Sequence, residues 1–96
     1  MEWLNKVPEK NKNLAWRIID GEIVILHLEN RAKALEQLYL LKGTAVELWQ
    51  LVDGERSVED ILKKIMNKYD IKLKDAKSDI IHFFSSLLKE RLIDFM

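Results

Sequence analysis

The chain has 96 residues, of which 48% are hydrophobic and 33% are charged, a composition typical of one globular domain. Sixteen basic residues balance sixteen acidic ones, so no net charge attracts nucleic acid or an anionic membrane. The absence of cysteine excludes disulfides, thiolate zinc sites and iron–sulfur clusters held by this chain alone.

The first 13 residues, MEWLNKVPEKNKN, are polar and contain the only proline, Pro8. They lack the apolar run of a signal peptide, and no later run approaches the roughly 20 apolar residues of a membrane span. We therefore expect a cytoplasmic protein that does not enter a membrane. Residues 1–13 are predicted as an N-terminal arm that docks through Trp3 and Leu4, and residues 14–96 as the folded domain.

Two β-rich runs follow on either side of Asp20-Gly21, a dipeptide typical of two-residue hairpin turns. The second run is apolar on both faces: one carries Ile23, Ile25 and His27, and the other Val24, Leu26 and Leu28. This pattern predicts a strand that is covered on both sides. A third short apolar run, Leu38 to Leu41, completes a three-stranded antiparallel meander.

From Gly43 onward the apolar residues recur with a helical period. In the first predicted helix, Trp49 is expected to anchor the helix to the core, and Asp53-Gly54 then reverses the chain. Ser57 is a good N-cap for the second helix, with Asp60 three residues later in the acidic variant of a capping box. Residues 58–69 have the clearest amphipathic pattern in the sequence.

The last predicted helix runs from Asp75 to about Arg91 and has an unusually wide apolar face. One stripe of its surface carries Ala76, Ile80, Phe83, Phe84 and Leu87. Ile81, Leu88 and Leu92 extend this stripe to nearly half of the circumference, which is more than one packing partner requires. Two interpretations stay open: a sheet and a second helix cover the whole arc, or Ile81 and Leu88 border a groove that is open to a partner.

Residues that could carry catalysis or bind a metal are isolated. His27 and His82 have no second ligand at metal-binding spacing, and no serine lies in a nucleophile elbow. The three glycines stand alone, without a phosphate-binding loop. We therefore predict a protein that is not an enzyme and that holds no metal or cofactor.

Nucleic acid is one alternative partner, because three strands and three helices of this size suggest a winged helix. Six lysines between residues 63 and 77 could contact phosphates: Lys63, Lys64, Lys68, Lys72, Lys74 and Lys77. Asp70, Asp75 and Asp79 interrupt this run, and the polar face of the last helix offers no Arg, Asn or Gln to read bases. DNA binding is therefore disfavoured.

Peptide binding fits the remaining features better. A short third strand at the edge of a meander exposes unpaired backbone groups, to which an extended peptide can add as a further strand. Ile81, Phe84 and Leu88 could supply an apolar wall, and nearby lysines would favour an acidic peptide. A second alternative is a homodimer that pairs the same edge with its twin.

Three segments of the chain, in this order, carry a family resemblance. They are VPEKNKNLAWRIIDGEIVIL with Pro8 and Trp16, GTAVELWQLVDGERSVEDI with Gly43 and Trp49, and the final DIIHFFSSLLKERLI. Over nearly everything from Val7 to Ile93, the chain resembles the PqqD-like proteins, which are also called RiPP recognition elements.

The resemblance implies an α+β, winged helix-turn-helix-like fold, in which a three-stranded antiparallel sheet precedes three helices. It also implies a non-catalytic adaptor that binds the leader segment of a ribosomally made precursor peptide. The adaptor presents this leader to a modifying enzyme, such as a radical S-adenosylmethionine (SAM) protein or a leader peptidase.

In the family, the leader adds to the third strand beside the last helix. The matching positions here are Leu38, Tyr39, Leu40, Leu41, Lys77, Ile81, Phe84, Ser85 and Leu88. The family often has a Leu-Asn pair where this chain has Tyr39-Leu40, so the sequence leaves open which of these two residues faces the groove.

Overall fold

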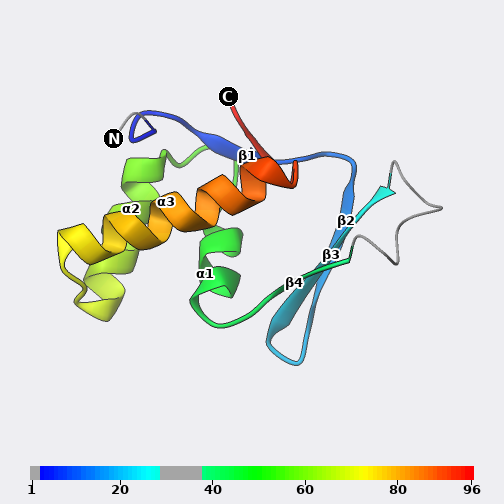
Figure 1. Ribbon diagram of the computed structural model, residues 1–96, viewed down its shortest axis with the longest axis horizontal. Coiled ribbons are helices and arrows are strands. Elements are labelled where there is room, and N and C mark those ends of the chain that lie inside the picture. Colours follow the sequence, from blue (N-terminus) through cyan, green and yellow to red (C-terminus); the bar gives the residue numbers. More distant parts are fainter. Residues whose placement is uncertain (1–2, 29–37) are drawn as a thin grey trace.

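A computed structural model describes residues 3–28 and 38–96 of the chain. Its larger sheet is antiparallel and contains β2 (Leu14–Ile19), β3 (Glu22–His27) and β4 (Tyr39–Leu41) in that order. Three helices follow: α1 (Thr44–Leu51), α2 (Val58–Tyr69) and α3 (Leu73–Lys89). The sheet forms one side of the molecule and the helices the other (Figure 1). The predicted α+β class and element order are therefore confirmed.

A second, two-stranded sheet joins the two ends of the chain. In it, β1 (Pro8–Lys10) pairs antiparallel with β5 (Ile93–Phe95). Trp3 and Leu4 pack against the core, as the sequence predicted for docking points of an arm. The backbone carbonyls of Leu4 and Lys6 also accept hydrogen bonds from the first N–H groups of α2. The sequence predicted neither β1 nor β5.

The hairpin between β2 and β3 turns at Asp20 and Gly21, as predicted. Both residues have positive φ angles, 51° and 79°, which match the twist of a two-residue hairpin. Asp20 tolerates this conformation better than most side chains do, and Gly21 has no Cβ to strain.

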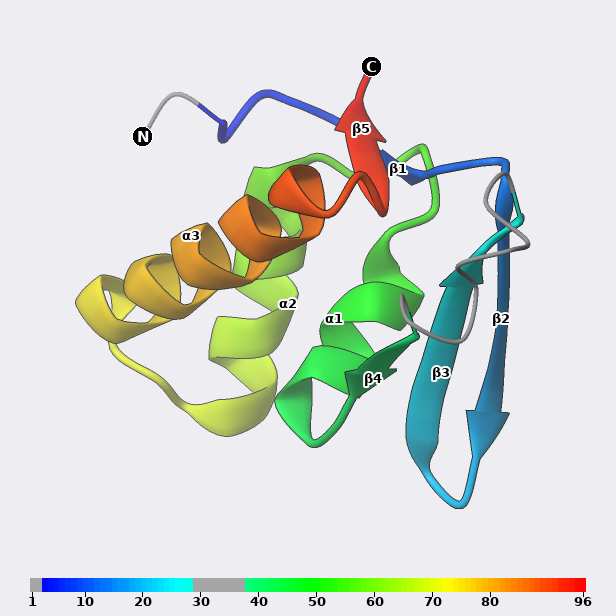
Figure 2. The ribbon, with the colours of Figure 1, turned by 45° about the vertical axis from the view of Figure 1, so that its right-hand side comes forward.

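The two faces of β3 are not equally covered. Ile23, Ile25 and His27 are buried, whereas the opposite face carries the half-buried Val24 and Leu26 and the exposed Leu28. The prediction that β3 is covered on both sides is therefore wrong. The helices lie against only one face of the sheet (Figure 2). On the outer face, apolar side chains such as Leu28 and Leu40 are exposed to solvent.

Helix ends are set by local hydrogen bonds. Ser57 and Asp60 form the predicted capping box at the start of α2, where each side chain accepts a hydrogen bond from the backbone N–H of the other, at 3.1 Å. α3 begins at Leu73, two residues before its predicted start. It ends in a Schellman motif, in which Leu92 N–H donates to the Leu87 carbonyl and Arg91 has a φ of 57°.

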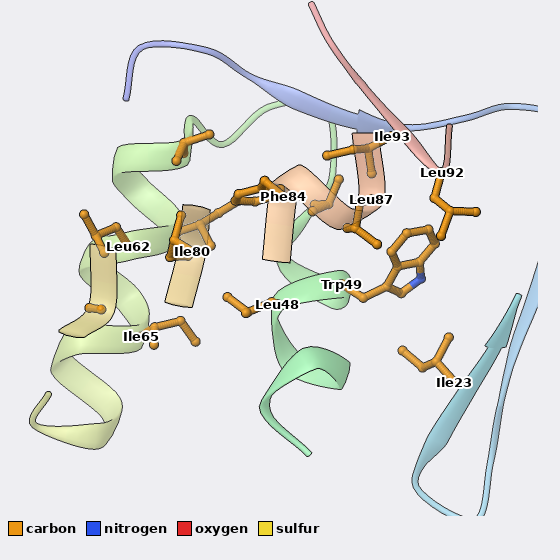
Figure 3. Close-up of a cluster of buried hydrophobic side chains, with 14 of the residues drawn as sticks. Ile23, Leu48, Trp49, Leu62, Ile65, Ile80, Phe84, Leu87, Leu92 and Ile93 are labelled. Carbon is orange, nitrogen blue, oxygen red and sulfur yellow. The ribbon is translucent and has the colours of Figure 1, made fainter. Parts of the chain in front are cut away.

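The hydrophobic core lies between the helices and the inner face of the sheet. Trp49 extends from α1 between Leu92 and Ile23 (Figure 3), and its side chain is fully buried, which confirms its predicted role as an anchor. On the helical side, Phe84 and Ile80 of α3 lie close to α2 (Figure 3). The sheet and the helices therefore share one core.

Lys10 of β1 contacts both the larger sheet and α1. Its Nζ atom lies 5.1 Å from the ring centroids of both Trp16 and Trp49, within the range of a cation–π interaction. Nζ also donates a hydrogen bond to the Val52 carbonyl. Burial lowers the pKa of Lys10, and the nearby Asp53 carboxylate opposes this shift.

Candidate functional site

The outer edge of β4 has no strand beside it in the described part of the chain. β4 pairs with β3 on one side, with Tyr39 opposite Ile25 and Leu40 opposite Val24. Residues that pair directly point to the same face of a sheet. Tyr39 therefore shares the core-facing side with Ile25, whereas Leu40 points to the outer face and is 47% exposed. This register answers the question that the sequence left open.

Two hydrogen bonds connect this sheet to the end of α3. The Tyr39 hydroxyl donates to the Glu90 carboxylate at 2.9 Å, and His27 Nε2 lies 2.9 Å from the Glu90 backbone carbonyl. Since a carbonyl only accepts, Nε2 carries the proton. Burial raises the pKa of Tyr39, and its hydrogen bond to the Glu90 carboxylate adds to this effect. Glu90 therefore fixes where β4 begins relative to α3.

A shallow hollow of about 590 Å³ lies along one flank of α3. Its lining residues are Lys74, Lys77, Ser78, Ile81, His82 and Ser85. Three of them, Lys77, Ile81 and Ser85, are among the residues that the resemblance assigned to a peptide site. Ile81 is 43% exposed, whereas its neighbour Ile80 is buried.

The predicted wall of the site needs one correction. Phe84 is fully buried and its ring contacts those of Phe83 and Phe95, so it belongs to the core and offers no surface to a ligand. Leu88 is half-buried and packs against the core. Thus the wide apolar arc of α3 is mainly covered by its own chain, and Ile81 is the member that stays open.

The hollow on α3 includes no residue of β4, so the two parts of the predicted site do not share one pocket. The β4 residues and Leu38, which precedes them and is exposed, lie on the sheet, whereas the hollow lies on α3. Among the described residues, the hydrogen bond between Tyr39 and Glu90 is the polar side-chain link between β4 and the C-terminal end of α3.

Sequence reasoning missed Lys74, Ser78 and His82 as lining residues of the hollow. The spacing of two of them held a signal, because Lys74 lies three residues from Lys77 and Ser78 lies three residues from Ile81, on one face of a helix. His82 is four residues from Ser78 and is not at such a spacing from Lys77 or Ile81.

A second hollow, of about 600 Å³, lies between α1 and α2 and includes part of the basic run. Lys68 forms an ion pair with Glu47 at 2.9 Å, and Lys63 forms one with Glu59 at 3.4 Å. A hydrogen bond from the Tyr69 hydroxyl lowers the pKa of Glu47, and Lys68 adds to this effect. Glu47 and Glu59 therefore neutralise two of the lysines that could bind DNA phosphates, so the structure does not favour DNA binding.

The described ranges hold no group of three or more His, Asp or Glu side chains arranged to bind a metal. None of the helices in those ranges is long and apolar enough to cross a bilayer.

A family model and a solved structure both match this chain. The family model described as coenzyme PQQ synthesis protein D (PqqD) matches residues 22–93. A solved structure entitled "TbiB1 in Complex with the TbiA(beta) Leader Peptide" superimposes with a TM-score of 0.76 at 21% sequence identity. The match covers 90% of this chain and 94% of the other, so the two share a fold. No curated protein sequence matches the chain.

Proposed function

Because the chain belongs to the PqqD family, we propose that it is a RiPP recognition element that binds the leader segment of a ribosomally made precursor peptide. The leader adds as a strand to the outer edge of β4 and rests its inward side chains on the α3 flank that contains Ile81. The observation that carries this proposal is the open β4 edge, held in place relative to α3 by Glu90.

Strand addition accounts for both affinity and selectivity at such a site. The N–H and C=O groups on the outer edge of β4, which have no strand partner among the described residues, can hydrogen bond to any extended peptide, whatever its side chains. Alternate side chains of the added strand would face α3 and the outer side of the sheet, as those of Tyr39 and Leu40 do in β4. Selectivity for one leader then comes from the α3 flank. The solved complex of TbiB1 with a leader peptide, on the same fold, supports the binding of a leader peptide.

We further propose that the chain is an adaptor and not a catalyst. It presents the bound leader to a separate modifying enzyme, such as a radical SAM protein or a leader peptidase, in the cytoplasm. The isolated histidines and serines of the sequence support this assignment. A reconstitution with the maturation enzyme encoded near its gene would test it: modification of the full precursor should require the chain, and a precursor without its leader should not respond to it.

The binding site itself can be tested by NMR. The ¹⁵N-labelled chain is titrated with synthetic leaders from precursor genes near its own gene. Chemical shift changes are expected at residues 38–41 and along the flank of 77–88. Changes confined to α2, with none in these two segments, would refute the proposed site.

A second candidate is self-association, in which a second copy pairs with the β4 edge and covers the outer face of the sheet. Ile19 and Leu40 both point to the outer face of the sheet and are each 47% exposed, so a second copy could cover them. Light scattering over a range of concentrations distinguishes the two candidates: a dimer that forms without peptide, and that leader peptides do not dissociate, favours self-association.

A further inference from the structure

Positive and negative charges are segregated around α3. Lys74 and Lys77 line the hollow together with Ile81. With about 100° of rotation per residue, Asp75 and Asp79 are each separated from both lysines by at least about 100° about the helix axis. The flank that carries the hollow is therefore basic, although the chain as a whole has no net charge.

Neither lysine is neutralised by a carboxylate in the described part of the chain. The ion pairs found there use other cations, namely Lys42, Arg56, Lys63 and Lys68. Lys10 is also engaged, between two tryptophan rings. Lys74 and Lys77 are thus positioned to pair with acidic groups of a ligand.

The spacing between charge and apolar surface matches an extended peptide. With a rise of about 1.5 Å per residue, Lys77 and Ile81 are separated by about 6 Å along the axis of α3. Residues i and i+2 of a strand point to the same face and are about 6.6–6.8 Å apart. For a peptide that runs along the axis of α3, one inward-facing side chain can therefore lie on Ile81 while the next one reaches Lys77, with Lys74 one turn beyond.

We propose that the α3 flank selects leader peptides in which an acidic residue lies two positions from a large apolar residue. The apolar side chain packs on Ile81, and the carboxylate pairs with Lys77 and Lys74. The proposal rests on the peptide-binding function above and adds the chemistry of the side chains that are selected. An extended acidic peptide fits better than a nucleic acid, because an exposed isoleucine lies at the centre of the flank.

A selection from a displayed library of random twelve-residue peptides tests the proposal. Wild-type chain should enrich peptides with Asp or Glu two positions from Leu, Ile, Phe or Met. The double variant Lys74→Glu/Lys77→Glu should instead enrich Lys or Arg at that position. Lys63→Glu/Lys64→Glu on α2 is the matched control, since it makes the same change of charge on another helix and should leave the selected motif unchanged.

Binding measurements give the size of the effect. For a peptide selected by the wild type, each single lysine-to-glutamate substitution on α3 should weaken binding by about 2- to 5-fold, the range of a partly exposed ion pair. This difference should shrink as NaCl rises from about 0.05 to 0.5 M, because salt screens exposed charges. The α2 control should bind with wild-type affinity.

The outcomes separate this proposal from the function on which it rests. Peptides that shift the NMR signals of β4 but show no acidic preference would overturn the charge selection and leave leader binding intact. An acidic preference that persists in the α3 variant and is lost in the α2 control would also overturn it. If no peptide from the library or from neighbouring precursor genes shifts β4, both proposals fail.

Discussion

Ile81→Ala is the most informative single substitution, because it separates a binding role from a packing role. The side chain is 43% exposed on the flank of α3, next to the fully buried Ile80. If a peptide covers Ile81, truncation removes apolar contact from the complex, and the free protein loses only the part of the side chain that is already buried. If Ile81 belongs to the core, the main loss is in stability.

The structure sets the expected size of both effects. Full burial of an isoleucine side chain contributes about 1.5–3 kcal/mol. The 43% that remains exposed is therefore worth at most about 0.6–1.3 kcal/mol when a peptide covers it, which corresponds to about 3- to 9-fold in Kd. By the same measure, the buried 57% contributes about 0.9–1.7 kcal/mol to the stability of the free protein, and the better helix propensity of alanine offsets part of this loss. The free energy of unfolding should therefore fall by less than about 1.5 kcal/mol.

The assay combines peptide titration by fluorescence anisotropy with urea unfolding of the same preparations. Ile19→Ala is the matched control, because Ile19 is 47% exposed and lies on the outer face of β2, away from the β4 edge. This variant should bind peptide like the wild type. Ile81→Glu should weaken binding by more than about 30-fold, because the peptide would have to desolvate a carboxylate.

Two results would refute this reasoning. A loss of about 2–5 kcal/mol in stability on Ile81→Ala would show that Ile81 is a core residue. Equal loss of binding in Ile81→Ala and Ile19→Ala would place the peptide on the sheet and not beside α3.

Three further predictions concern the scaffold around the site. Phe84→Ala should destabilise the fold by about 3–5 kcal/mol in urea unfolding, since it empties a buried site; a change below about 1 kcal/mol would argue against its place in the core. Ser57→Ala should cost about 1 kcal/mol by removing the N-cap of α2, whereas Ser57→Asp, which keeps a capping oxygen, should cost less. The raised pKa of Tyr39 means that the folded state holds this proton more tightly than the unfolded state, so this contribution to stability is present below about pH 10 and is lost above it. Urea midpoints measured across this range should therefore fall more steeply with pH for the wild type than for Tyr39→Phe, and parallel curves would contradict the assignment.

Local patterns in the sequence were sufficient for most elements of the fold. Asp20-Gly21 predicted the hairpin because few residues accept its positive φ angles. Ser57 and Asp60 predicted the start of α2 because their side chains satisfy backbone groups only three residues away. Such signals lie within a few residues of one another and need no distant partner.

Features that depend on contacts between distant segments could not be predicted from local patterns. β1 and β5 pair residues that are more than 80 positions apart, and each strand has only three residues. The end of α3 carries no glycine signal, because Arg91 occupies the left-handed position of its Schellman motif. The outer face of β3 is as apolar as a buried face, and only the arrangement of the helices shows that it stays partly exposed.

For the candidate site too, some features follow from the sequence and others only from the tertiary structure. The sequence by itself predicts a wide apolar arc on the last helix, a short edge strand at residues 38–41 and a chain without a catalytic set. Only the tertiary structure decided that Phe84 lies in the core while Ile81 stays exposed, and that Tyr39 rather than Leu40 faces the helices. Helical periodicity defines which residues share a face, but the elements that pack on that face define how much of it remains for a partner.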